Sequence, residues 1–355
     1  MKTNHFISII SIAFILSFAL GASAKSEEYS NTYNTQYDVQ KGVQLKINCE
    51  FTDIKAYNWD KDVISIEVNV SVDAKNQDQA QKRLQLISVD MDGNPSEVKL
   101  RTNLEKNYFG HNHDNNIDIE VIIYYPSYTN IDLENDFGNC LFEDIDGKVS
   151  VEMSYGNFSA QDLTQTDLDL EAEFGKIDVN RFQGGKVEVS YGGFTAEVVG
   201  AIRLTSEFSS NDINMADHLE LNTSYDKDYL GTITTTFVDS EFSNIKIDKL
   251  TKHLRLETAY GSFRLNEISP DFELIDISSE FTGIKLAFLP PLSFSFEANV
   301  EMGNFKYPKE LAHITYIDKE MMELNIKGYF GESKENNSEV ILNIENATAS
   351  INVNE

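Results

Sequence analysis

The chain has 355 residues, and its 58 aspartates and glutamates outnumber its 29 lysines and arginines, giving a formal net charge of −29. This charge argues against nucleic acid and anionic membrane surfaces as partners, because phosphate contacts need clustered lysine and arginine. The 22 phenylalanines and 16 tyrosines exclude a disordered acidic tail, since they supply enough apolar surface for a core.

The first 24 residues have the pattern of an export signal. Lys2 precedes an apolar run from Phe6 to Leu20, and Ala22-Ser23-Ala24 has the small-x-small form of a signal-peptidase site. The run is shorter than the ~20 residues that span a bilayer. We therefore predict a signal peptide over residues 1–24 and an exported mature chain beginning at Lys25. The leader carries one lysine and no acid, so the mature chain is one charge more negative.

Residues 25–128 form an N-terminal region that differs from the rest of the chain. Strand-like runs at Val63–Val72 and Ile117–Tyr125 surround a short helix predicted near Ala74–Leu86, with Asp73 or Asn76 as its N-cap. We expect this region to be continuous with residues 129–355 in one domain.

A loop at 107–116 holds the best metal-like cluster in the sequence. His111 and His113 are one residue apart, so their side chains point to one side of an extended chain, and Asp114 follows. No third spaced ligand is visible. A solvated loop with incidental histidines is the alternative interpretation.

An aromatic residue followed by glycine or another small residue recurs from residue 137 onward, at intervals of 17 to 21 residues. Phenylalanine and tyrosine alternate, with an acid before each phenylalanine and a serine or alanine before each tyrosine. Such fixed-period similarity indicates a repeat architecture. Phe51 looks like an earlier copy, and the later positions are Phe137, Tyr155, Phe174, Tyr191, Phe208, Tyr225, Phe242, Tyr260 and Phe281, with Met302 in the tenth place.

Within one repeat, apolar and polar residues alternate. Leu170, Ala172 and Phe174 fall on one side of an extended chain, as in a half-buried strand. The apolar phase shifts after Gly175, which predicts a corner where glycine supplies a positive φ. This pattern places the aromatic rings in the core. Exposed rings that stack on sugars are the alternative for Tyr155, Tyr191, Tyr225 and Tyr260.

Repeats of about 18 residues with two short strands cannot bury a face alone and must stack, which predicts an all-β, parallel β-solenoid (β-helix). A large antiparallel β-sandwich or meander, whose strands also recur regularly, is the alternative. Residues 308–338 break the repeat, and the pair Glu339–Ile344 and Ala349–Val353 lacks the aromatic, as a capping coil would.

The acids before the phenylalanines predict the length of one coil. If one coil held two repeats, these acids would stack about 4.8 Å apart and repel by about 0.9 kcal/mol per neighbour. If one coil holds one repeat, they lie about 9.6 Å apart, beyond the roughly 8 Å Debye length. We therefore predict one repeat per coil. These acids are a candidate cation-dependent binding stripe, with a solvated outer face as the alternative: Glu50, Asp136, Glu173, Glu207, Glu241 and Glu280.

The two cysteines, Cys49 and Cys140, invite a disulfide in an exported chain. Both fall on the inward parity of their strands. They occupy different positions in the repeat, so two free thiols are the alternative.

The sequence resembles an exported "putative adhesin" β-solenoid family of unknown function, common in Gram-negative bacteria. The resemblance rests on Val43–Val70 (VQLKINCEFTDIKAYNWDKDVISIEVNV), on Ile122–Phe158 (IIYYPSYTNIDLENDFGNCLFEDIDGKVSVEMSYGNF) and on the repeats that follow. It implies a solenoid fold and a location in the periplasm or at the cell surface or outer membrane. It brings no catalytic motif.

Zinc-protease, CxxC, GxSxG, phosphate-loop and EF-hand motifs are all absent from the sequence, and no cofactor is predicted beyond Ca²⁺ as one reading of the acidic stripe. The first functional hypothesis is a non-enzymatic exported solenoid that serves in adhesion, as an envelope scaffold, or in binding a glycan or cell-surface protein. The second is a polysaccharide-active β-helix glycosidase or lyase, because 58 acids can supply two catalytic carboxylates. The third is an envelope-stress signalling component.

Overall fold

The computed structural model describes residues 26–105, 116–332 and 337–354. The predicted signal peptide and the cluster of His111, His113 and Asp114 lie outside these residues. The described residues form 26 strands and one helix, which confirms the all-β prediction. No helix among them is long and apolar enough to cross a membrane. The chain divides into two compact units, one ending at Gly175 and one beginning at Lys176.

The first unit contains the helix α1, Gln77–Leu84, whose N-cap is Asn76 as predicted: the Asn76 side chain accepts a hydrogen bond from the Gln79 N–H. Its strands are β1 (Glu27–Asp38), β2 (Gln44–Glu50), β3 (Thr52–Asn58), β4 (Val63–Ala74), β5 (Ile87–Asn94), β6 (Glu97–Leu104), β7 (Ile117–Tyr125), β8 (Asn130–Asp136), β9 (Cys140–Phe142), β10 (Val149–Ser154), β11 (Phe158–Leu163) and β12 (Leu168–Glu173).

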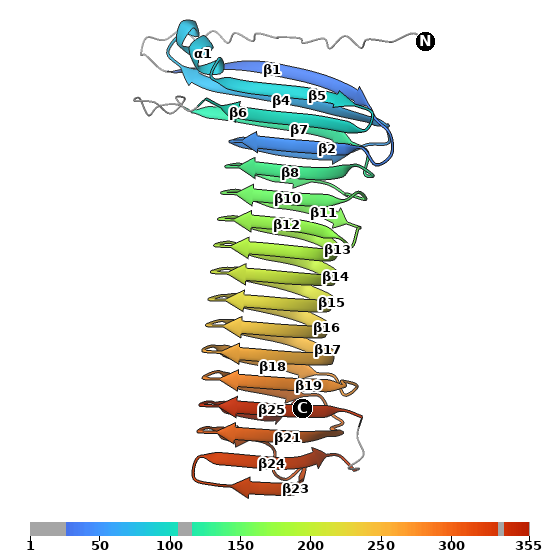
Figure 1. Ribbon diagram of the computed structural model, residues 1–355, viewed down its shortest axis with the longest axis vertical. Coiled ribbons are helices and arrows are strands. Elements are labelled where there is room, and N and C mark those ends of the chain that lie inside the picture. The colour runs from blue at the N-terminus through green and yellow to red at the C-terminus, as the bar shows by residue number, and fades with distance from the viewer. Residues whose placement is uncertain (1–25, 106–115, 333–336, 355) are drawn as a thin grey trace. The chain divides into compact units, whose positions relative to one another are not determined.

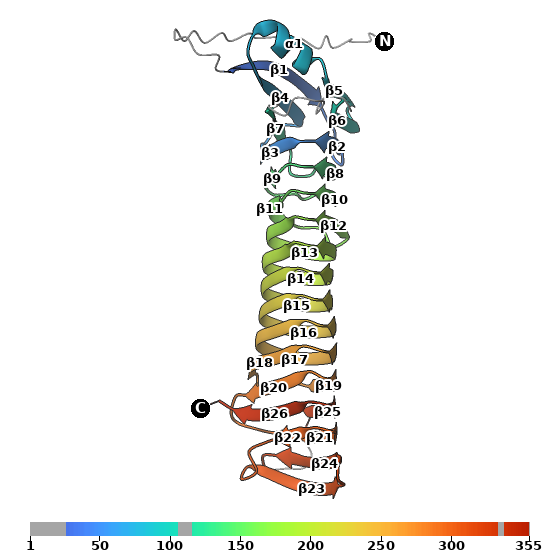
Figure 2. The same cartoon turned by 90° about the vertical axis from the view of Figure 1, so that its left-hand side faces the viewer.

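In this unit the repeats stack as parallel strands. β2, β8, β10 and β12 pair in that order in parallel, and β3, β9 and β11 form a second parallel row (Figure 2). β1, β4 and β7 pair antiparallel, and α1 lies against β4 and β1. The parallel rows place Ile47, Leu133, Val151 and Leu170 in one buried column.

The second unit begins with five long strands that each run through a whole repeat, β13 to β17, and continues through shorter ones. Its strands are β13 (Lys176–Ser190), β14 (Gly193–Glu207), β15 (Ser210–Ser224), β16 (Lys227–Glu241), β17 (Asn244–Ala259), β18 (Ser262–Ile268), β19 (Leu274–Glu280), β20 (Gly283–Phe288), β21 (Phe294–Glu301), β22 (Asn304–Lys306), β23 (Ala312–Lys319), β24 (Glu323–Phe330), β25 (Glu339–Glu345) and β26 (Thr348–Val353).

Parallel pairing in the second unit advances by one repeat at each step, as predicted from the charge spacing. Val187 lies beside Leu204, which lies beside Leu221, and the column continues through Val238 and Leu256. All five side chains are buried, so the core of this unit is a stack of equivalent apolar positions. Figure 1 shows the strands that carry them stacked one above the next.

The C-terminal strands do not cap this stack, contrary to the prediction. β25 lies between β19 and β21 and pairs in parallel with both, while β26 pairs with β20 and β22. The last strand of the stack is instead β23, which pairs with β24 antiparallel, and β24 pairs with β21. The order of the repeats in the sequence does not predict this insertion, because β25 and β26 come from the C-terminal end of the chain and pair between strands that are much earlier in the sequence.

The corner of each coil differs from the prediction in its backbone. The aromatic residue itself has the positive φ, for example 53° at Tyr155 and 54° at Phe174, and the glycine that follows these two residues is needed for space. A Cβ on Gly156 would lie 1.9 Å from the Gly138 carbonyl oxygen, and one on Gly175 would lie 1.8 Å from that of Gly156. Glycine is therefore selected by the close approach of consecutive coils.

Candidate binding surface

The corner aromatics form a ladder of stacked rings in each unit. In the first unit Phe51, Phe137, Tyr155 and Phe174 are in consecutive contact, with ring centroids 4.8 Å apart and planes within 6°. In the second unit successive centroids are 4.8 to 5.1 Å apart and the planes differ by at most 12°. That ladder consists of Tyr191, Phe208, Tyr225, Phe242, Tyr260 and Phe281.

Stacking offsets the cost of the corner conformation. A left-handed backbone costs a non-glycine residue about 1–2 kcal/mol. A stacked aromatic pair contributes about 0.5–1.5 kcal/mol beyond its buried area, and an inner ring makes two such pairs. A ring at this position therefore holds the corner at little net cost, which explains why phenylalanine and tyrosine occupy a conformation that usually favours glycine or asparagine.

The prediction that these rings lie in the core is wrong. Each is 40–53% exposed from Phe137 to Phe281, because a positive φ turns the side chain out of the alternating pattern of the preceding strand. The alternative of sugar-stacking tyrosines also fails for the inner rings. Both faces of Tyr155, Tyr225 and Tyr260 are covered by neighbouring phenylalanines, so these rings present only their edges and hydroxyls to solvent.

The predicted acids border the ladder. Ser154 pairs with both Asp136 and Glu173 in the first unit, and in the second unit Ser224 separates Glu207 from Glu241. Ala259 likewise separates Glu241 from Glu280. The predicted alternation of acid and small residue is thus confirmed along the regular repeats, where it keeps neighbouring charges two strands apart.

At two places acids are direct neighbours, against the prediction. Glu50 pairs with Asp136 in the first unit. In the second unit Glu345 lies between Glu280 and Glu301, because β25 inserts there, and Glu301 also pairs with Glu323. We call this run the acidic row: Glu280, Glu345, Glu301 and Glu323. Glu345 precedes Asn346, whose φ of 53° matches that of the corner aromatics.

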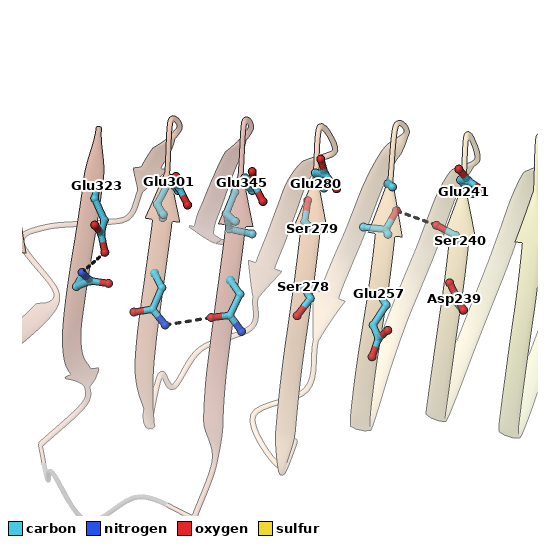
Figure 3. A pocket seen from close by; sticks show the side chains of 17 residues that line it. Asp239, Ser240, Glu241, Glu257, Ser278, Ser279, Glu280, Glu301, Glu323 and Glu345 are labelled. Carbon is cyan, nitrogen blue, oxygen red and sulfur yellow. Dashed lines mark hydrogen bonds between the residues drawn. The ribbon is translucent and has the colours of Figure 1, made fainter. Parts of the chain in front are cut away.

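The acidic row borders a shallow hollow of about 550 Å³ on the outer face of the second unit. Figure 3 shows its carboxylates side by side at the strand ends, with Asp239 and Glu257 farther down the strands. Asn299 donates a hydrogen bond to Asn343 at 3.0 Å, and Asn325 donates one to Glu323 at 2.9 Å. The hollow is therefore lined by acids and amides on neighbouring strands.

Electrostatically, the acidic row is unneutralised. Among the described residues, no lysine, arginine or histidine forms an ion pair with Glu280, Glu345 or Glu301, whereas Glu257 is paired with Arg255 at 3.0 Å. Carboxylates at strand spacing repel by about 0.9 kcal/mol per neighbour in water. Among the described residues no group of three potential ligands is placed to hold a metal ion. The row can instead attract separate cationic groups, one per coil.

A buried polar network lies in the core of the second unit, and the sequence analysis missed its role. Asp226 and Asp228 are 3% and 1% exposed. Asp228 accepts hydrogen bonds from Asn211 at 2.7 Å and from the Thr223 hydroxyl at 2.9 Å, and Asp226 accepts from Thr223 at 2.7 Å and from the Ser209 N–H at 2.6 Å. Burial raises the pKa of Asp228 to about 6. The polar residues after Tyr225 were the available signal.

The two cysteines are buried, free thiols in the first unit, so the structure contains no disulfide between Cys49 and Cys140. Burial raises the pKa of Cys49 to about 11, and burial likewise raises that of Cys140. Asn135 donates to the Cys140 sulfur at 3.4 Å, and its own side-chain oxygen has no partner. Both thiols are therefore inert core groups.

The described histidines are separate from one another and do not extend the metal hypothesis. His253 pairs with Glu273 at 3.0 Å, while His218 and His313 each pack on one aromatic ring, Phe237 and Tyr329 respectively.

These features define an all-β repeat protein with exposed aromatic ladders and an acidic border. No family model matches the chain, and no curated protein sequence matches it. Solved structures do resemble it. A "putative adhesin" from Parabacteroides merdae shares 9% identity over 71% of this chain and 94% of its own, with a TM-score of 0.36. A "putative adhesin" from Bacteroides fragilis shares 11% identity over 66% and 95%, with a TM-score of 0.32. A "putative lipid binding protein" from Parabacteroides distasonis shares 10% identity over 71% and 94%, with a TM-score of 0.35.

Two of these three names contain the words "putative adhesin", as does the name of the family that the sequence resembles. The surface of this chain itself offers two features for binding, the exposed aromatic ladder and the acids that border it.

Proposed function

We propose that the protein is an exported, non-enzymatic β-solenoid that binds a cell-surface protein through the aromatic ladder and its acidic border. Parallel pairing that advances one repeat per step supports the solenoid. The observation that carries the function is the exposed ladder itself: rings 40–53% exposed, repeated coil after coil beside unneutralised carboxylates. Exposed aromatic residues are enriched in protein-binding sites.

The geometry favours a protein partner over a glycan. Sugars bind aromatic residues through the ring face, and the inner rings have both faces covered. What remains accessible is a line of ring edges, tyrosine hydroxyls and carboxylates, which suits apolar side chains interspersed with lysine and arginine. The preferred partner is therefore a protein surface with regularly placed basic residues.

The repeated chemistry supports binding rather than catalysis. An active site brings different groups together on one reacting atom. Here the same two groups, a ring and a carboxylate, recur along the stack, as Phe208 with Glu207 and Phe242 with Glu241. Such repetition suits an extended contact in which each coil adds a similar increment.

The test uses the fluorescently labelled mature chain on intact bacterial cells, read by flow cytometry before and after protease removal of surface proteins. Glu241→Gln combined with Glu280→Gln should weaken binding about ten-fold, the order expected for two charge contacts. Asp178→Asn combined with Asp212→Asn removes the same charge from other exposed positions and should have little effect. Binding that survives protease treatment, or release of sugars from a polysaccharide panel, would contradict the proposal.

A further inference from the structure

The strand β23 is an exposed sheet edge at the end of the second unit's stack. It pairs with β24, and no other described strand pairs with it (Figures 1 and 2). Residues 314–319 are exposed without the alternation seen in the other strands of the stack, so both faces of β23 are accessible. Unpaired strand edges are templates for pairing with another extended chain.

The edge is also apolar. Ile314, Tyr316 and Ile317 are 39%, 50% and 58% exposed, and Met321 and Met322 in the adjoining turn are 96% and 63% exposed. The strand contains no proline, and its eight residues carry one acid, Asp318, and one base, Lys319. The strand at this end of the stack thus has no net charge, although the whole chain has a net charge of −29.

The hydrogen bonds of the hairpin show which backbone groups are free. The Glu320 N–H donates to the Glu323 carbonyl at 2.9 Å, so Glu320 faces β24. Residues that face the partner strand alternate with residues that face away in an antiparallel pair. Asp318 therefore faces β24, whereas Ile317 and Lys319 direct their N–H and C=O groups outward. A bulge between Ile314 and Tyr316 limits the regular edge to its second half.

We propose that β23 pairs antiparallel with β23 of a second copy of this chain, on a two-fold axis at Ile317. The Ile317 residues of the two copies then exchange two backbone hydrogen bonds, and the outward-facing Lys319 lies opposite Thr315. Tyr316 lies opposite Asp318, whereas Ile314 lies beyond the bulge, outside the regular edge. No like charges are opposed in this register, and two-fold symmetry, which an antiparallel pair of identical strands obeys, is the commonest symmetry of homo-oligomers.

A second copy fits this edge better than a basic partner does, because the edge is neutral and apolar while the rest of the chain is acidic. The remaining charge of the two copies opposes association, so salt should strengthen the dimer by screening that repulsion. Binding of a basic partner to the acidic row should instead weaken with salt. The two surfaces can thus be distinguished in one titration.

Sedimentation velocity of the mature chain, over 1–200 µM protein and 50–500 mM NaCl, tests the proposal. We expect a dimer whose fraction rises with protein concentration and salt. Ile317→Lys places like charges on the axis and should abolish the dimer. Ile314→Lys makes the same chemical change on the same strand but lies beyond the bulge, outside the paired edge, so that variant should remain dimeric. Both positions are exposed, and unchanged circular dichroism and Tm establish that each variant folds.

Cysteine trapping tests the register independently. A directly opposed, hydrogen-bonded pair has Cα atoms about 5.5 Å apart, within the range of a disulfide. Ile317→Cys should therefore give a covalent dimer under mild oxidation, and Ile314→Cys should not. A chain that stays monomeric at 200 µM and high salt, equal effects of the two lysine variants, or equal crosslinking of the two cysteine variants would overturn the proposal. So would a monomer that binds an unrelated extended apolar peptide along β23.

Discussion

Asp228 should make the protein less stable at neutral pH than at mildly acidic pH. The carboxyl group is 1% exposed, and its pKa is raised to about 6 because burial disfavours the charged form. Its unfolded value is about 3.9. A raised pKa means that the folded state binds the proton more tightly than the unfolded state does. The free energy of unfolding therefore decreases as the pH rises from about 4 to above 6.

The magnitude follows from the two pKa values. A difference of about 2 units corresponds to about 3 kcal/mol when Asp228 is fully ionised in the folded protein. The substitution Asp228→Asn should therefore raise the free energy of unfolding by most of this amount at pH 8 and by almost nothing at pH 4. The amide also fits the network, since the Thr223 hydroxyl lies within hydrogen-bond distance of both Asp226 and Asp228 but has one proton and can donate to only one of them at a time. In the variant Thr223 can donate to Asp226 and accept from the new amide.

Thermal and urea unfolding from pH 4 to pH 8 measure the effect. A gain of about 3 kcal/mol is expected to raise the Tm by roughly 6–12 °C at pH 8. The acidic chain as a whole also responds to pH, so the informative quantity is the difference between variant and parent. Asp212→Asn, which removes the same charge from an exposed position, is the control. If the stability difference for Asp228→Asn were the same at pH 4 and pH 8, the reasoning about burial would be refuted.

Two other predictions concern the first unit. Gly156→Ala should prevent stable folding or cost several kcal/mol, because its Cβ would overlap the Gly138 carbonyl oxygen, and a chain with an unchanged Tm would contradict the close-approach argument. The thiols of Cys49 and Cys140 should stay unreactive toward a thiol reagent at pH 8 until urea unfolds the chain, since both are buried with raised pKa values. Rapid native labelling would show that this core opens, and a chain that released no thiol even when unfolded without reductant would show that the two are oxidised.

The ladder shows how a correct repeat can lead to a wrong side-chain direction. Leu168, Leu170 and Ala172 alternate inward as predicted, and Phe174 continues their parity in the sequence. Parity holds only while φ stays negative, and φ at Phe174 is 54°. The glycines that follow Tyr155 and Phe174 were predicted to supply the positive φ, but their contribution is the space that a Cβ would fill. Sequence patterns report periodicity well and report single left-handed residues poorly.

The spacing of the acids, unlike the direction of the rings, was predicted correctly along the regular repeats. The alternation of acid with serine or alanine predicted one repeat per coil, and the pairing of Glu207, Ser224 and Glu241 follows it. The inference holds there because electrostatic repulsion acts between neighbouring strands, and in the regular part of the stack the neighbouring strands belong to consecutive repeats. It failed at Glu280 and Glu301, where Glu345 arrives from a distant part of the chain.

The sequence by itself determined the class of the fold and the length of the repeat, and it narrowed the helix N-cap to Asp73 or Asn76, because these depend on local periodicity and on contacts between consecutive repeats. Only the tertiary structure decided which way the rings face, where the C-terminal strands insert and which edge stays open. The direction of the rings depends on one backbone angle per coil, which the alternation of apolar and polar residues does not report, and the other two features depend on pairing between segments far apart in the chain.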